Sequence, residues 1–160
     1  MAGIRHFTSI DDLSSKEVLL LLELAEELRN ERNRGITRDP LRGKSLAMIF
    51  EKPSLRTRMT FDVGMSQLGG HAFYLAPSEI QIGERESVED VARNLSRWVD
   101  GIMARTFLHE TVLGLVEHGS VPVINALSDV EHPCQALAFG QLVLAERGSL
   151  SQQVRGQVVR

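Results

Sequence analysis

Cysteine is nearly absent from the sequence, since Cys134 is the only one among 160 residues. A single thiol cannot form an internal disulfide, which excludes the class of small domains stabilised by disulfides. Basic residues are not in excess either: 18 lysines and arginines face 21 aspartates and glutamates, for a formal net charge of −3. General nucleic-acid and membrane-surface binders usually have a basic excess, so an anionic ligand must meet locally placed arginines here.

Long apolar runs are also missing. The N-terminal stretch has no hydrophobic segment of signal-peptide or membrane-spanning length, so we expect a soluble, cytoplasmic protein with neither membrane nor nucleic-acid partners. The hydrophobic content of 42% over 160 residues is still enough for one domain with its own core.

The hydrophobic residues that are present follow two alternating patterns. Leucines and alanines at helical spacing predict an amphipathic helix over 16–29 that ends near Gly35. Beyond it we expect strands at 45–50, 71–76, 101–105 and 121–127, and helices at 54–68, 88–98, 110–118 and 134–146. This order predicts an α/β fold of three layers, with a parallel four-stranded sheet and helices on both faces.

Residues 51–58, with the sequence EKPSLRTR, directly follow the first predicted strand. In a parallel sheet the ligand site lies beyond the carboxyl ends of the strands. Ser54 and Thr57 can cap a helix start there, and the free backbone N–H groups of such a start attract a phosphate. Arg56 and Arg58 add positive charge that can hold phosphate oxygens. The alternative interpretation is a capped helix with surface arginines.

Two other strand ends carry unusual residues. Arg105 ends the third predicted strand, where a charge is either a rim residue in a salt bridge or a site residue. The sequence EHPCQ at 131–135 follows the fourth strand and places His132 and Gln135 at the same edge, although a His-Pro turn can be purely structural. Cys134 beside His132 has neither metal-ligand spacing nor an oriented base, so we expect no metal site and no covalent chemistry.

The connection over 78–87 is polar, contains a glycine, and is longer than a tight strand-to-helix connection requires. We interpret it as either a mobile lid or a solvated loop.

Together these segments resemble the aspartate/ornithine carbamoyltransferase family. The family's phosphate motif has the form Ser-x-Arg-Thr-Arg and its carbonyl motif the form His-Pro-x-Gln, and both occur here in the right order. Further matching segments bring the coverage to about 5–150; they are 50–52, 61–63, 90–93, 96–101 and 104–106. Chance agreement across so many separated motifs is implausible.

The resemblance implies a role for each matching residue. Four residues would cradle the phosphate of carbamoyl phosphate; they are Ser54, Leu55, Arg56 and Thr57. Arg105 would bridge the phosphate and the carbonyl oxygen, while His132 and Gln135 would hold the carbamoyl group. The catalytic residues would be Arg105, His132 and Thr57, with no cofactor.

The resemblance also implies an acceptor and an assembly. Gln81 within IQIG, together with HPCQ, favours ornithine over aspartate, and hence an enzyme of arginine biosynthesis. Gln81 would serve the adjacent subunit of a homotrimer. Residues 1–150 would be the carbamoyl-phosphate-binding domain, and 151–160 either the truncated start of the ornithine-binding domain or a disordered tail, in which Val158 and Val159 suggest a strand cut short.

The sequence departs from the family pattern in three ways. Leu55 stands where many relatives have threonine, and Phe139 where an aspartate usually follows the His-Pro-x-Gln motif. The family's ornithine-binding segments, a Ser-Met-Gly loop and a His-Cys-Leu-Pro segment, do not occur. Three hypotheses remain open: a carbamoyltransferase domain with little turnover alone, a noncatalytic binding or oligomerisation module, and a carbamoyltransferase for another amine, such as putrescine or acetylated ornithine.

Overall fold

Four parallel strands form the centre of the computed structural model, which describes residues 3–83 and 85–157. They are β1 (Ser45–Phe50), β2 (His71–Leu75), β3 (Gly101–Arg105) and β4 (Val123–Asn125), in the spatial order β2-β1-β3-β4. Each neighbouring pair is parallel, as the alternation in the sequence predicts. The N-terminal segment adds a bridge between Phe7 and Ile124 at the outer edge.

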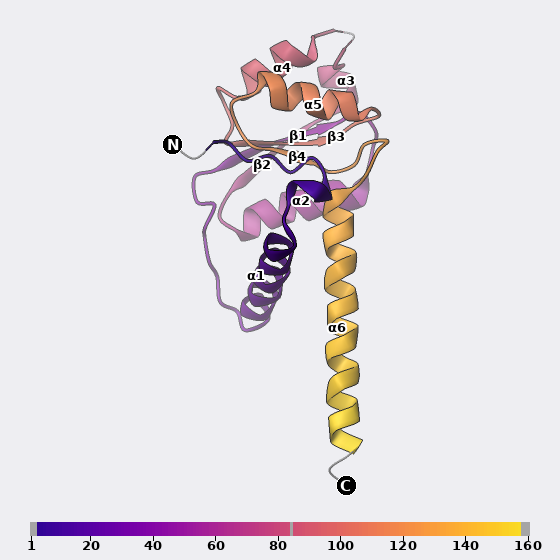
Figure 1. The fold of residues 1–160 in the computed structure, drawn as a ribbon. Coiled ribbons are helices and arrows are strands. Elements are labelled where there is room, and N and C mark those ends of the chain that lie inside the picture. Colours follow the sequence, from indigo (N-terminus) through magenta and orange to yellow (C-terminus); the bar gives the residue numbers. More distant parts are fainter. Residues whose placement is uncertain (1–2, 84, 158–160) are drawn as a thin grey trace.

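Helices cover both faces of this sheet (Figure 1), which confirms the three-layer prediction. Two helices lie on one face, α4 (Val88–Leu95) and α5 (His109–His118). The opposite side holds α1 (Ser15–Asn33), α2 (Leu55–Gln67) and α6 (Pro133–Gln157). None of the helices in the described ranges is long and apolar enough to span a membrane.

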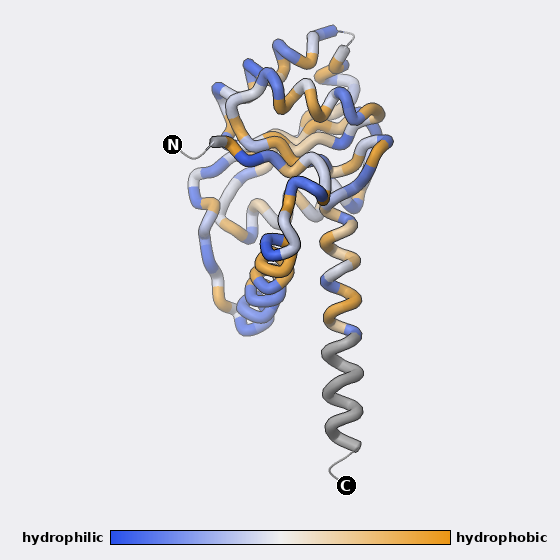
Figure 2. Tube along the Cα trace, viewed as in Figure 1, coloured by the Kyte–Doolittle hydropathy of each residue, from blue (hydrophilic) through white to orange (hydrophobic). Residues whose placement is uncertain are grey.

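The core has two halves because successive strand residues point to opposite faces. Ala47 and Ile49 of β1 pack with residues of α4 and α5, whereas Met48 and Phe50 pack toward α2. The strands β1 and β3 are therefore buried on both sides, whereas β2 at the sheet edge is only partly covered, and Figure 2 shows the sheet as a hydrophobic centre between more polar helices. Burial on both faces explains why β1 and β3 are apolar runs rather than alternating patterns.

Several element boundaries differ from the sequence predictions. The fourth strand covers only Val123–Asn125 instead of 121–127, because Pro122 has no N–H for the ladder and Leu127 has a φ of 145°. The last helix continues to Gln157 rather than ending at 146, because Gly148 and Gly156 are each tolerated within a helix at a cost of about 1 kcal/mol. Val158 and Val159 lie outside the described residues.

Two further predicted segments are shaped differently. The helix expected over 88–98 ends at Leu95, and the next residues form a turn in which Trp98 N–H donates to the Leu95 carbonyl at 2.9 Å. The connection over 78–87 is not a plain loop. It begins with α3 (Pro77–Ile80) and closes with a bridge between Ile82 and Glu86.

The strand order creates a switch point between β1 and β3. The chain leaves β1 through α2 on one face to reach β2, and it returns through α4 on the other face to reach β3. Connections that diverge to opposite faces leave a crevice at the carboxyl ends of the two strands. The residues that follow Phe50 and Arg105 therefore lie at this crevice.

Candidate functional site

The first turn of α2 is built to receive an anion. Ser54 is its N-cap, in extended conformation with φ −157°, and its Oγ accepts a hydrogen bond from Thr57 N–H at 3.4 Å. The N–H groups of Leu55 and Arg56 belong to the helix start and have no partner within the helix. No acidic residue lies in this turn, so the positive end of the helix dipole is not compensated by the protein.

Arg105 lies beside this helix start because of the strand register. It pairs with Phe50, the last residue of β1, and its carbonyl accepts a hydrogen bond from Glu51 N–H at 2.9 Å. Its guanidinium Nη1 donates to Thr57 Oγ1 at 3.4 Å. The third strand and the helix after the first strand thus direct their polar groups to one point.

The Arg105 guanidinium lacks a counter-charge in the described part of the chain. Neither Arg105 nor Arg56 takes part in any of the salt bridges there, and the buried Nε of Arg105 has no hydrogen-bond partner. Burial, and then the neighbouring charge of Arg56, lower the pKa of Arg105 below its ordinary value. Two adjacent cations with an unused donor favour the binding of an anion.

His132 extends the crevice from the side of β4. It immediately precedes α6, and in the described ranges its buried Nδ1 has no hydrogen-bond partner. Burial, and then the charge of Arg105, lower the pKa of His132 below 6.5, so the imidazole is neutral at pH 7. Gln135 follows within the first turn of α6, where its N–H donates to the His132 carbonyl at 3.0 Å, and its side chain is exposed.

Two residues singled out in the sequence point elsewhere. The Arg58 guanidinium lies over the Tyr74 ring, 3.8 Å from its centroid, so it does not share the phosphate role expected of both arginines. Gln81 is exposed in left-handed conformation at the end of α3, with φ 42°. None of the hydrogen bonds of the described residues joins its side chain to the crevice, so its role toward a neighbouring subunit stays a prediction.

Sequence reasoning missed the buried polar residues below His132. Asn125, the last residue of β4, is fully buried, and Ser128 is 5% exposed. Both hydrogen-bond to the loop that leads from β4 to His132. The signal was present, since an asparagine ends an otherwise apolar strand, but its contact with Thr8 joins segments that are 117 residues apart.

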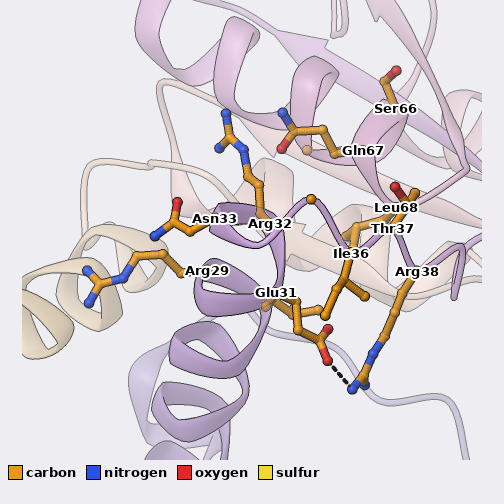
Figure 3. A pocket seen from close by; sticks show the side chains of 13 residues that line it. Arg29, Glu31, Arg32, Asn33, Ile36, Thr37, Arg38, Ser66, Gln67 and Leu68 are labelled. Carbon is orange, nitrogen blue, oxygen red and sulfur yellow. Dashed lines mark hydrogen bonds and ion pairs between the residues drawn. The ribbon is translucent and has the colours of Figure 1, made fainter.

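A separate cavity lies away from the crevice (Figure 3). It has a volume of about 480 Å³ and is lined by the last turns of α1 and α2 together with the segment after α1. Because the crevice is at the start of α2, this cavity is at the opposite end of that helix. Two of the arginines that line it are paired with glutamates, Arg29 with Glu26 and Arg38 with Glu27 and Glu31.

The crevice chemistry is that of binding and polarisation. Burial raises the pKa of the Cys134 thiol to about 11, so this side chain is not a thiolate nucleophile at neutral pH. Within the described ranges, histidines, cysteines and carboxylates do not gather into a group of three or more that could hold a metal. The groups of the crevice that can bind a ligand are the start of α2, the two arginines Arg56 and Arg105, and the neutral imidazole of His132. Together they suit a phosphate that is joined to a polar group.

Comparisons with known proteins lead to the same ligand. The sequence profile described as "Aspartate/ornithine carbamoyltransferase, carbamoyl-P binding domain" matches residues 5–140. The ornithine carbamoyltransferase of Hydrogenovibrio crunogenus is 50% identical over 148 residues, which make up 92% of this chain and 49% of that protein.

Solved structures give the same result. The ornithine carbamoyltransferase from Pyrococcus furiosus matches with a TM-score of 0.89 at 44% identity, covering 91% of this chain and 47% of that one. An N-acetyl-L-ornithine transcarbamylase matches with a TM-score of 0.82 at 30% identity, covering 91% and 49%. The chain spans about half the length of these relatives. It belongs to the aspartate/ornithine carbamoyltransferase family and represents its carbamoyl-phosphate-binding domain.

Proposed function

We propose that this chain binds carbamoyl phosphate in the crevice between β1 and β3 and supplies that half of an ornithine carbamoyltransferase. The observation that carries the proposal is the uncompensated Arg105, whose Nη1 reaches Thr57 and whose charge acts on His132. The N–H groups of Leu55 and Arg56 and the Ser54 cap hold the phosphate. Arg105 bridges the phosphate and the carbonyl oxygen.

The carbamoyl end is recognised from α6 in this proposal. His132 hydrogen-bonds the carbonyl oxygen through its neutral ring, and Gln135 binds the carbamoyl amino group. A glutamine side chain fits that task because its amide oxygen accepts hydrogen bonds. Inorganic phosphate lacks this end, so the two groups of residues can be tested separately.

The reaction follows from the chemistry of the ligand. Carbamoyl phosphate is a mixed anhydride, so the protein mainly positions it and stabilises charge while a neutral amine attacks the carbonyl carbon. Arg105, His132 and Thr57 stabilise the oxyanion of the tetrahedral intermediate. When the bond between the carbonyl carbon and the bridging oxygen breaks, Arg56 and the start of α2 stabilise the departing phosphate, which takes up the proton that the attacking amine loses.

The acceptor is ornithine in our proposal, and the product is citrulline. The family resemblance assigns ornithine binding to a second domain, and this chain spans about half the length of its relatives, so we expect little turnover from it alone. The exposed Gln81 completes the site of a neighbouring subunit in a homotrimer. A free, partly buried cysteine suits the reducing cytoplasm, where the anabolic reaction of arginine biosynthesis would take place.

A noncatalytic binding or oligomerisation module is the second candidate. Phe139 on α6 is 64% exposed where the family pattern expects an aspartate, and Leu142 on the same helix is 57% exposed. Exposed apolar side chains of this kind suit contact with another protein. A different amine acceptor is a third candidate, because a relative named for N-acetyl-L-ornithine shares this fold.

Citrulline formation from carbamoyl phosphate and ornithine distinguishes these candidates. We expect no significant product from the 160-residue chain alone and product when a separately expressed ornithine domain of a relative is added. Product from the chain alone would contradict the incomplete site, and no product on complementation would favour the noncatalytic module. Replacing ornithine by acetylornithine or putrescine tests the acceptor, and sedimentation equilibrium tests the trimer.

A further inference from the structure

A buried amide lies below the loop that presents His132. Asn125 ends β4, and its Oδ1 accepts a hydrogen bond from Leu127 N–H at 3.0 Å. Its Nδ2 donates to the Thr8 carbonyl at 2.9 Å and makes longer contacts of 3.4 Å with Ser128 Oγ and the Glu131 carbonyl. One side chain thus binds both ends of the loop, at Leu127 and at Glu131, and anchors them to the N-terminal segment.

The start of this loop has a backbone conformation that needs support. Leu127 has a φ of 145°, in a region that side chains other than glycine rarely adopt. Its carbonyl accepts a hydrogen bond from Thr106 N–H at 2.9 Å, and its N–H is the group held by Asn125. Among the hydrogen bonds of the described residues, only the one from Thr106 to the Leu127 carbonyl would still hold the backbone of Leu127 without the Asn125 amide.

The rest of the loop is braced from two sides. Ser128 Oγ lies 2.9 Å from His109 Nδ1, and Asp129 Oδ1 accepts the His109 backbone N–H at 2.7 Å, so the start of α5 holds one side. On the other side, Glu131 accepts a hydrogen bond from Ile10 N–H at 3.1 Å. Asn125 Nδ2 contacts both braced residues, Ser128 and Glu131, and the Ser128 N–H also donates directly to the Glu131 carbonyl at 3.0 Å.

We infer that Asn125 is a positioning residue, which sets the place of His132 over the carbonyl end of the ligand and leaves the phosphate end unaffected. The phosphate end is built by α2, and Asn125 has no hydrogen bond to any residue of that helix in the described part of the chain. The loop held by Asn125, by contrast, leads directly to His132 and Gln135. This inference rests on the proposed function.

Asn125→Asp is the sharpest test, because it keeps the shape and the Oδ1 acceptor. It replaces the Nδ2 donor by an oxygen that faces the carbonyls of Thr8 and Glu131, so the loop must move. Displacing the loop weakens the hydrogen bonds of His132 and Gln135 to the carbamoyl group, and each such bond is worth up to ~10-fold in affinity. We therefore expect calorimetry to show carbamoyl phosphate binding weakened by ~10- to 100-fold, with inorganic phosphate binding unchanged.

Two companion variants control the test. Asn94→Asp adds the same charge on the exposed surface of α4 and should leave both affinities as in the parent chain. Ser128→Ala removes one brace without adding charge and should give a smaller loss with the same selectivity for carbamoyl phosphate. If circular dichroism shows that Asn125→Asp does not fold, Ser128→Ala replaces it, and the same comparison of the two ligands decides the test.

The outcomes separate this inference from the proposed function. A folded variant that binds both ligands as the parent does, or loses both equally, would overturn the positioning role. A parent chain that binds neither ligand would instead refute the carbamoyl phosphate site itself. As a second readout, the ring proton signals of His132 should shift in Asn125→Asp, which a change in stability alone would not produce.

Discussion

Replacing Arg105 by methionine should weaken ligand binding strongly without unfolding the chain. Methionine retains the unbranched stem of arginine and removes the guanidinium, which touches Thr57 and acts on His132. The proposal gives Arg105 a hydrogen bond to the phosphate and another to the carbonyl oxygen. Hydrogen bonds to charged groups contribute about 1.5–3 kcal/mol each. Two of them correspond to at least about 3 kcal/mol, or a ~100-fold increase in Kd.

The stability of the ligand-free chain should hardly change in Arg105→Met, or should rise slightly. Arg105→Met removes one contact with Thr57, worth about 1 kcal/mol. It also removes a buried Nε without a partner in the described residues and the unfavourable proximity of Arg56. These effects offset each other, so the free energy of unfolding without ligand should change by less than about 1 kcal/mol.

The assay is calorimetric titration with carbamoyl phosphate, paired with thermal unfolding of the ligand-free chain. Arg58→Gln is the matched control, because it removes an arginine from the same helix region whose guanidinium lies on Tyr74 instead. We expect it to change Kd by less than about threefold, since exposed charges at a distance are largely screened by salt. Unchanged affinity in Arg105→Met, or an equal loss in Arg58→Gln, would refute the assignment.

Three further predictions concern single side chains. NMR should show that His132 titrates with a pKa below 6.5. The folded state then binds fewer protons at His132 than the unfolded state does. The chain is therefore most stable with respect to this group above pH 6.5, and it loses that stability as the pH falls through the lower pKa of the folded state. An unshifted titration would contradict this. Ser54→Ala should cost about 1 kcal/mol in urea unfolding through loss of the helix cap, and should also weaken phosphate binding. Cys134, with a pKa raised to about 11, should resist iodoacetamide at neutral pH until urea unfolds the chain; rapid native labelling would show an exposed thiolate.

Most of the fold could be predicted because its central strands, β1 and β3, are buried on both faces. An apolar run such as that of β1 marks a central parallel strand, and the bounds of β1 and β3 agree with the predictions. The location of the site followed from the same pattern, since parallel strands bring their carboxyl ends to one edge. Arg105 and Thr57 are distant in sequence, yet this rule alone predicts that they lie near each other.

The remaining features depend on partners that local sequence does not reveal. The direction of Arg58 depends on Tyr74, which comes from the neighbouring strand β2. The conformation of Leu127 is supported by Asn125, which also joins both ends of the loop after β4 to the N-terminal segment through Thr8. The contact with Thr8 is specific to the assembled fold, so no hydrophobic period or turn signal predicts it.

Calorimetric titration of the unmodified 160-residue chain with carbamoyl phosphate decides whether the crevice binds this ligand. We predict saturable binding with one ligand per chain, and competition by inorganic phosphate for the start of α2. Absence of binding by a chain that circular dichroism shows to be folded would contradict the claim that this crevice is a carbamoyl phosphate site.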